Sequence, residues 1–427
     1  MTAHLHPFHD PRIAESTPPR EIVSGEGVRV TDSEGTVFVD AVAGLWCASL
    51  GFAPERLRRA AEAQMGRLAY YHNFKGRVCD VTERLAETLV ARLPGGLGHV
   101  LFANGGSEAV DTAVKLARYA QASMGHEGRV RVIARDGAYH GSNVTSAALT
   151  GMGYVHDGFH LPHDDVIRIA RPHWLHGRRE GEGERAFADR LVAELEETIL
   201  AEGADTIAAF IGEPVMGTGG VIVPPEGYWA GVQSVLRRHG ILLIADEVIC
   251  GFGRTGRWFG CETYGIEPDL MTMAKQLTGA VFPLSAVAMT GAVREAVAER
   301  AHGRGMLGHG VTYGGHPVGA AVALETLAVY EEMGLEAHVA ALGERLAAAL
   351  APLRQHPHVR EVRQVGLIAA VEFEDAAMGA QIYARAEAAG VFFRQIGPTI
   401  ALCPPYVATP EDLDLMGRTL VEAAATL

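Results

Sequence analysis

The feature that most constrains the fold is the alternation of short apolar segments with longer amphipathic ones. Segments of strand length lie at residues 99–103, 129–134, 206–211, 241–245 and 284–289. Amphipathic segments of helical length lie between them, for example at 107–121 and 187–201, and residues 228–239 read as a helix ended by Gly240. Strands that alternate with helices predict an α/β fold with a mostly parallel sheet covered on both faces.

Two charged residues follow predicted strands. Asp246 comes directly after the strand at 241–245, and the apolar run 270–274 leads to Lys275. Ligands of such sheets bind at the carboxyl ends of the strands. A lysine amine can form a Schiff base with a cofactor aldehyde, and an aspartate keeps a pyridine nitrogen protonated so that the ring accepts electrons. Apolar surroundings disfavour the ammonium form, which helps Lys275 act as amine and base. This pair predicts a pyridoxal 5′-phosphate enzyme.

A phosphate cradle is predicted after the strand at 99–103. Glycines at 105 and 106 let backbone N–H groups approach an anion, and Ser107 can cap the helix that follows. An ordinary capped turn has the same pattern. Tyr139 and His140 follow the strand at 129–134, and a flat aromatic there can stack on a pyridine ring, although such a pair more often belongs to a core. Its position between the glycines and Asp246 favours the cofactor.

Residues 251–256 form a G-x-G-x-x-G pattern after a strand, which is typical of a dinucleotide site. That motif requires a helix whose N-terminus meets the pyrophosphate, and the residues that follow form a helix poorly. The pattern therefore favours a loop over a nicotinamide site.

Five histidines, at 156, 160, 163, 173 and 176, are spaced so that some could ligate a metal. Gly158 and Pro162 break any helix that would align the first three, and no thiol joins them. We expect a solvated histidine-rich loop and no metal site.

Composition excludes several classes of partner. The net charge of −14 disfavours nucleic acid and anionic membranes. The five cysteines are scattered, which is typical of reduced thiols. Residues 1–19 lack the apolar core of a signal peptide, and the longest apolar runs are too short for a membrane span. A cytoplasmic enzyme is expected.

The C-terminal part reads as a compact α+β unit. Its predicted helices lie at 317–333, 336–353 and 381–389, and its strands at 359–365, 369–373 and 391–394. Residues 27–32 and 36–40 predict a small β-meander with a turn at 33–35. The predicted division is an N-terminal segment at 1–45, a large domain at 46–305 and a small domain at 306–427.

The runs 244–256 and 269–275 resemble the signature of class III aminotransferases, the ω-transaminase group, and the resemblance extends from His6 to Pro405. It implies pyridoxal phosphate fold type I, with a large cofactor domain, a smaller C-terminal domain and an N-terminal segment packed on the latter. It implies phosphate ligands at Gly106 and Ser107, Tyr139 and His140 at the ring, Glu213 near the cofactor, and Val248 on the Asp246 strand against the opposite face of the ring.

Residues 309–317 resemble the family's H-G-x-T-Y-x-x-H-P motif. The resemblance implies that Thr312 reaches the phosphate bound by a neighbouring subunit, so the protein would be a homodimer with a shared active site. A glycine-rich turn before a helix with Pro317 near its start has the same pattern.

Substrate residues come from the same resemblance. Residues 44–47 resemble the G-L-W-C of amine:pyruvate enzymes, so Trp46, with Phe74 and Tyr139, would form an apolar wall for an amine, while Lys75 leaves the polarity of this wall open. Arg394 matches the mobile arginine of that group, whose guanidinium pairs with a carboxylate. A surface arginine at a strand end is the alternative.

The sequence therefore predicts an ω-transaminase that transfers an amino group from a primary amine or ω-amino acid to an α-keto acid, with pyruvate as the expected acceptor. The reaction would be ping-pong, through pyridoxamine phosphate. A class III decarboxylase or aminomutase would share every cofactor residue. A nicotinamide oxidoreductase, based on residues 251–256, is the other alternative.

Overall fold

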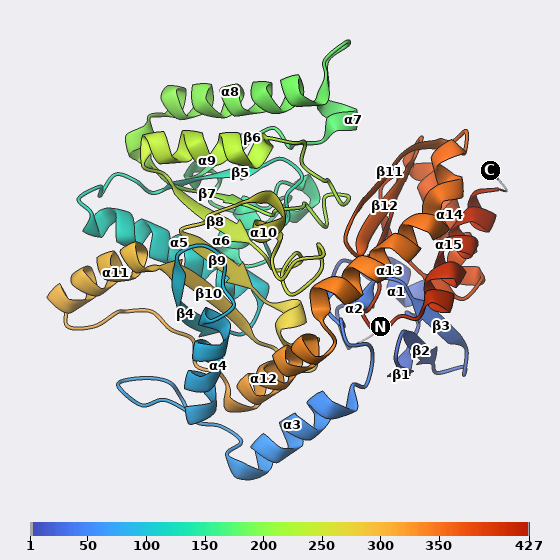
Figure 1. Ribbon diagram of the computed structural model, residues 1–427, viewed down its shortest axis with the longest axis horizontal. Helices are drawn as coiled ribbons and strands as arrows, with labels where there is room; N and C mark the ends of the chain where they lie inside the picture. Colours follow the sequence, from blue (N-terminus) through green and yellow to red (C-terminus); the bar gives the residue numbers. More distant parts are fainter. Residues whose placement is uncertain (1–2, 426) are drawn as a thin grey trace.

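The computed structural model describes residues 3–425 and 427, and its centre is a seven-stranded sheet (Figure 1). The order is β4 (Leu97–Ala103), β10 (Ser285–Thr290), β9 (Leu270–Met273), β8 (Leu242–Asp246), β7 (Ile207–Gly212), β5 (Arg131–Arg135) and β6 (Val166–Ile169). The five strands from β9 to β6 pair in parallel, whereas β10 is antiparallel to both of its neighbours. The predicted mostly parallel sheet is confirmed.

Helices cover both faces of this sheet, because alternate residues of its strands point into two different cores. In β8, Leu243 and Ala245 join the core that includes α8 (Glu184–Glu202) and α9 (Tyr228–His239). Ile244 joins the opposite core, beneath α5 (Gly106–Ser123) and α11 (Gly291–Gly303). Figure 1 shows the two pairs of helices on opposite sides of the sheet. Strands buried on both faces explain the nearly continuous apolar runs of the sequence.

The C-terminal part forms a separate antiparallel sheet, seen on the right of Figure 1. Its order is β11 (Val359–Val365), β12 (Ile368–Phe373), β15 (Thr399–Leu402) and β14 (Arg394–Ile396). Its helices are α13 (Leu335–Leu350), α14 (Ala376–Ala388) and α15 (Pro410–Ala424). Each pair of neighbouring strands is antiparallel, as expected for a sheet that faces helices on one side.

The N-terminal sheet contains a strand from the far end of the chain. The meander of β1 (Ile22–Glu26), β2 (Arg29–Asp32) and β3 (Val37–Asp40) is completed by β13 (Val391–Phe392), parallel to β3. The single strand predicted at 391–394 is therefore wrong. The chain crosses between the two small sheets at Phe393, whose side chain is buried in the core.

Eight further α-helices belong to the described fold, besides short 3₁₀ turns. They are α1 (Pro11–Ser16), α2 (Ala43–Trp46), α3 (Glu55–Arg67), α4 (Asp80–Val90), α6 (Val144–Leu149), α7 (Trp174–Gly177), α10 (Gly260–Tyr264) and α12 (Pro317–Glu332). α12 packs on α3 and α4 and leads into α13. Among the described residues, no helix combines the length and the apolar character that crossing a membrane requires. The three-part division at residues 45 and 305 stays a prediction.

Candidate active site

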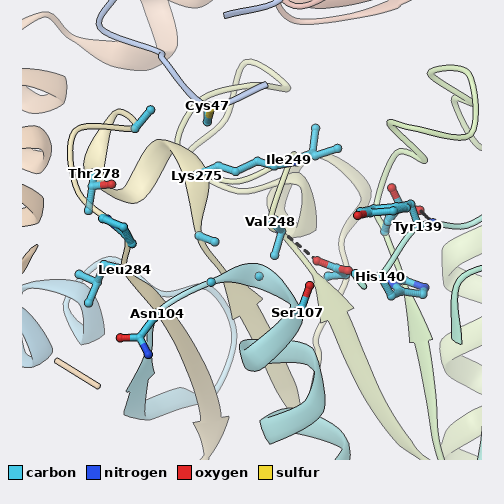
Figure 2. Close-up of a pocket in the computed structure, with 18 of the residues that line it drawn as sticks. Cys47, Asn104, Ser107, Tyr139, His140, Val248, Ile249, Lys275, Thr278 and Leu284 are labelled. Carbon is cyan, nitrogen blue, oxygen red and sulfur yellow. Dashed lines mark hydrogen bonds and ion pairs between the residues drawn. The ribbon is translucent and has the colours of Figure 1, made fainter. Parts of the chain in front are cut away.

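The predicted cofactor residues converge at the carboxyl ends of the central strands. Asp246 is the last residue of β8, Lys275 lies two residues beyond β9, and Glu213 directly follows β7. A cavity of about 360 Å³ opens there (Figure 2). Its lining includes Gly106, Ser107, Tyr139, His140, Glu213, Asp246, Val248 and Lys275. Eight of the predicted site residues therefore share one cavity, at the edge of the sheet where open α/β folds bind ligands.

Asp246 is held by three hydrogen bonds. Its Oδ2 lies 2.7 Å from Nδ1 of His140, and its Oδ1 accepts hydrogen bonds from the Thr272 hydroxyl at 3.0 Å and the Val248 amide at 3.1 Å. The Asp246 side chain is 4% exposed. Thr272 reaches it because β8 and β9 pair with Asp246 opposite Thr272. A buried carboxylate needs such partners, and together they fix its direction.

Lys275 adopts an unusual backbone conformation at the start of a short 3₁₀ turn, Lys275–Thr278. Its φ is +50°, in the left-handed region that side-chain-bearing residues rarely occupy. Strain of this kind concentrates at functional sites. Burial lowers the pKa of the Lys275 ammonium below its ordinary value, opposed by nearby groups that include Asp246. Burial therefore shifts Lys275 toward the amine form.

The glycine turn before α5 leaves room for an anion. A Cβ atom at Gly106 would come within 3.1 Å of the Val248 side chain, so a larger residue would narrow the cavity. The helix starts at Gly106, and its N-cap is Gly105, which offers no side-chain cap. The predicted capping role of Ser107 is therefore wrong. Its hydroxyl instead accepts a hydrogen bond from the Ser142 amide at 3.0 Å, because Gly141 approaches it closely.

Glu213 lies on the side of the cavity nearest Tyr139. Its carboxylate accepts hydrogen bonds from the backbone amides of Tyr139 at 3.3 Å and Gly217 at 2.9 Å. Burial raises the pKa of Glu213, and the neighbouring Asp246 acts in the same direction, whereas His140 and Arg135 oppose it. Glu213 thus fixes the backbone that presents Tyr139, as its predicted position near the cofactor requires.

Val248 lines the cavity but is not part of a strand. β8 ends at Asp246, and the chain turns after it, with the Val248 amide bonded back to Asp246. The expectation that Val248 shares a strand face with Asp246 is therefore wrong, although its side chain still faces the glycine turn. Figure 2 shows Val248 above the start of α5, between Lys275 and His140.

These residues fit pyridoxal 5′-phosphate. The uncapped N-terminus of α5 offers free backbone N–H groups for a phosphate, next to a glycine cradle that a side chain would fill. A lysine amine and a fixed carboxylate border the same cavity, as the aldehyde and the pyridine nitrogen require. Lys275, Asp246, Gly106 and Ser107 would hold the group, with Tyr139 beside it.

The other four predicted residues lie outside this cavity. Trp46 is 4% exposed and buried beside Cys47, which does line the cavity. Phe74 borders a separate cavity, where its ring lies against Gly310. Thr312 is exposed, and its carbonyl accepts a hydrogen bond from the Tyr70 hydroxyl at 2.9 Å. Arg394 borders a third cavity.

The segment 251–256 has a structural role. Arg254 is fully buried and donates hydrogen bonds to the carbonyls of Leu367 at 2.9 Å and Pro404 at 2.7 Å. No helix begins at these glycines, since the next helix, α10, starts only at Gly260. The segment therefore joins the central sheet to the C-terminal part. The prediction that residues 251–256 form a loop is confirmed.

The histidine segment is only partly solvated. His160 and His163 are exposed, but His173 is 4% exposed, with Nε2 3.5 Å from the Glu372 carboxylate. His176 also bonds to that carboxylate, and Arg363 pairs with it at 2.6 Å. The solvated loop is therefore wrong for His173, because Glu372 lies far away in the sequence.

Several cavity residues were not predicted. Cys47, Thr278 and Phe282 line the cofactor cavity, and Thr272 supports Asp246 without lining it. Cys47 directly follows Trp46 in the G-L-W-C run, and Thr272 lies in the apolar run before Lys275. Both residues lie inside runs that the sequence already singles out, so they could have been found by considering every position of those runs. Phe282 carries no comparable signal.

Comparisons with known proteins agree with this geometry. The model of the family described as aminotransferase class-III matches residues 13–424. The chain is 40% identical to diaminobutyrate–2-oxoglutarate transaminase of Halomonas elongata over 422 residues, 94% of this chain and 89% of the relative. It is 41% identical to the chloroplastic gamma-aminobutyrate transaminase 3 of Solanum lycopersicum over 408 residues, 93% of this chain and 78% of the relative.

A solved structure, the ω-transaminase of Pseudomonas jessenii in complex with PMP, superposes with a TM-score of 0.98 at 42% identity and covers 99% of this chain and 96% of that one. The fold is therefore pyridoxal phosphate fold type I. From the family match, the relatives and the cavity formed by Lys275, Asp246 and the glycine turn, we conclude that the chain belongs to the class III aminotransferases, enzymes that use pyridoxal 5′-phosphate.

Proposed function

We propose that the protein is an ω-transaminase that transfers the amino group of a primary amine or ω-amino acid to an α-keto acid, with pyruvate as acceptor. The observation that carries this proposal is a lysine amine in one cavity with Asp246, together with a second cavity bordered by Arg394, whose buried Nε has no partner among the described residues. The likeness to an ω-transaminase structure supports it. The relatives named for diaminobutyrate and gamma-aminobutyrate support an ω-amino acid as an alternative donor.

Each residue then has a task set by its position. When bound, pyridoxal 5′-phosphate supplies an electron sink and carries the amino group between the two half-reactions. Lys275 would supply the amine that anchors the cofactor and would move the proton at the substrate Cα. Asp246, held by His140 and Thr272, would keep a proton at the pyridine nitrogen. Tyr139 and Val248 would confine the ring, and Gly106 and Ser107 the phosphate.

In a ping-pong reaction the amine and the keto acid enter the same cofactor cavity in turn. In our proposal Arg394 pairs with the keto-acid carboxylate and moves aside for a neutral amine. Trp46 and Phe74 contribute the apolar wall on the amine side, and Thr312 acts at the phosphate of a second subunit in a homodimer. The exposure of Thr312 and its separation from the cofactor cavity of its own chain support this shared arrangement. We further propose a cytoplasmic location and the three-part division at residues 45 and 305.

The test is a spectrum of the purified protein before and after addition of (S)-1-phenylethylamine, with no keto acid present. We expect a yellow band that bleaches, together with formation of acetophenone. Pyruvate should then restore the band and yield alanine. Release of carbon dioxide from an amino acid, or an isomeric amino acid product, would instead identify a decarboxylase or an aminomutase.

A further inference from the structure

A cluster of metal-ligating side chains lies outside the cofactor cavity, at the contact between α7 and the C-terminal sheet. His173 directly precedes α7, His176 lies within it, and Glu372 lies on β12. His176 and Glu372 bond to each other although they are 196 residues apart in the sequence. Figure 1 shows α7 on the side of the molecule that faces β11 and β12. The cluster therefore connects two separate parts of the fold.

The three side chains bring their ligand atoms close together. Nε2 of His173 lies 3.5 Å from Oε2 of Glu372, and Nε2 of His176 bonds to Oε1 of the same carboxylate. One ligand atom from each residue lies within 4.8 Å of the other two, and in the described part of the chain no other three His, Cys, Asp or Glu residues meet this condition. Ligand atoms around a tetrahedral zinc ion, each about 2.0–2.1 Å from the metal, are about 3.4 Å apart. The distance from His173 to Glu372 matches this spacing.

Burial distinguishes the cluster from an ordinary surface ion pair. The side chains of His173 and Glu372 are 5% and 3% exposed, whereas that of His176 is 38% exposed. At 3.5 Å the contact between His173 and Glu372 is longer than a normal hydrogen bond, so the buried imidazole gains little from it. An ion between the two groups would satisfy both. The half-exposed His176 leaves such an ion a route from solvent.

Arg363 holds the carboxylate from its other side. Its guanidinium pairs with Oε2 of Glu372 at 2.6 Å and donates to the carbonyls of Gly220 at 2.8 Å and Val221 at 3.3 Å. An ion bound through the other oxygen of Glu372 leaves this pairing intact, and the arginine then orients the ligand. The positive charge of Arg363 also repels a cation, so the affinity should be lower than that of a closed four-ligand site.

We propose that His173, His176 and Glu372 form a zinc site that joins α7 to the C-terminal sheet, with water as the fourth ligand. Two imidazoles and one carboxylate are a ligand set that Zn²⁺ accepts, whereas Ca²⁺ and Mg²⁺ prefer oxygen ligands alone. None of the three lines the cofactor cavity, so the inference is independent of the proposed function.

The site revises the expectation that the histidine segment binds no metal. That expectation depends on spacing along the chain, which cannot reveal that Glu372 lies beside the two histidines. A bound ion would also fix the segment that carries Arg171, two residues before His173. Arg171 borders the same cavity as Arg394, so the ion would hold one wall of that cavity.

The test measures zinc binding by the holoenzyme after treatment with a chelator. Zn²⁺ is titrated by calorimetry, and thermal unfolding is recorded with and without the ion. We expect one ion per chain at this site and a rise of roughly 2–4 °C in Tm at about 100 times the Kd, because the ion binds the folded protein only. Co²⁺ should give the intense visible absorption of a tetrahedral site, at longer wavelengths than the cofactor absorbs.

Two variants each remove one ligand and keep a polar side chain beside Glu372. His176→Gln and His173→Gln should weaken Zn²⁺ binding at least about 10- to 100-fold, which is the effect of losing even a second-shell partner, and should abolish the Co²⁺ absorption. His358→Gln is the matched control. His358 also pairs with a glutamate, Glu374 at 3.3 Å, but no third ligand among the described residues joins them. This control should bind zinc as the wild type does.

Two results would overturn the site. The first is the absence of zinc binding and of a rise in Tm in the wild type. The second is binding of equal strength in the wild type and in His176→Gln, which would place the ion elsewhere on the protein. If His173→Gln fails to fold, His176→Gln decides alone, because its side chain is half-exposed. No readout depends on turnover, so failure of the proposed function would leave the result on zinc unchanged.

Discussion

The cofactor cavity and the neighbouring cavity of Arg171 and Arg394 differ in how their charged groups are paired. In the first, Asp246 has three hydrogen bonds, and Glu213 accepts from two backbone amides. In the second, two guanidinium groups have no partner among the described residues. Groups that hold a resident cofactor are fixed by the fold, whereas groups that bind substrates in turn keep free donors. This contrast fits our proposal that the first cavity holds the cofactor permanently and that the second binds substrates in turn.

The largest effect is expected from substitution of Lys275, the reacting group of the cofactor cavity. Lys275→Ala should lose the yellow absorbance and lower turnover by about 10²–10⁴-fold or more, because both the anchoring amine and the base are removed. Lys275→Arg should behave in the same way, since a guanidinium keeps the charge but cannot replace the amine. Visible spectra and product formation measure both. Turnover in either variant at the wild-type rate would contradict the role of Lys275.

The fixed carboxylate comes next. Asp246→Asn keeps the size of the side chain but loses its charge, so turnover should fall about 100-fold as the pyridine nitrogen loses its proton. Thr272→Val removes one of the three hydrogen bonds and should cost only about 1 kcal/mol of stability, with a small loss of turnover. Rates and thermal unfolding of the two variants measure this order. A larger loss of turnover in Thr272→Val than in Asp246→Asn would contradict the role given to the Asp246 charge.

Arg394→Gln tests the proposed pairing of Arg394 with the carboxylate of the keto acid. The variant should raise KM for pyruvate about 10- to 100-fold and leave KM for the amine within about twofold, because only the keto acid carries the carboxylate. Steady-state kinetics with each substrate varied in turn provide the measurement. An equal rise for both substrates would show that Arg394 supports the entrance without pairing with the acid.

The charged residues of the cofactor cavity could be predicted from the sequence, whereas most of the residues of the second cavity could not. Asp246 and Lys275 follow apolar runs, and strand ends in a parallel sheet meet at one edge, so their convergence follows from the pattern. Arg171 belongs to no motif, and only the folded chain brings it to the cavity that Arg394 borders. The sequence predicts a solvated His173, because its partner Glu372 lies on β12, far along the chain.

The same limit applies to the fold. The helix Tyr228–His239 and the strand Val359–Val365 match their predicted bounds, because local periodicity determines both. The short strands β13 and β14 read as one run, since only their partners, β3 and β15, assign them to different sheets. β1 was not predicted, and its five residues are mostly exposed and lack a clear apolar alternation.

The last expected effect is on stability and concerns Glu247, the residue after Asp246, whose carboxylate accepts hydrogen bonds from the amides of Gly260 at 3.0 Å and Cys261 at 2.6 Å. Burial raises the pKa of Glu247 to about 7. A carboxyl whose pKa is raised by folding contributes its stability at low pH and loses it as the pH rises through the folded value. The wild type should therefore lose on the order of 3 kcal/mol between about pH 4.5 and 7 through this group.

Glu247→Gln removes this titration but supplies a single carbonyl acceptor for two amides. We expect the variant to be less stable than the wild type at pH 5 and to recover relative to it by pH 8, as thermal unfolding at each pH would show. Glu180→Gln, at an exposed position with no ion pair among the described residues, is the matched control and should follow the wild type throughout. A constant difference between Glu247→Gln and the wild type would mean that Glu247 does not titrate in this range. In that case Glu247 would be a second permanently charged carboxylate beside Asp246, held like it by hydrogen bonds. The contrast with the two arginines that have no partner among the described residues would then be larger.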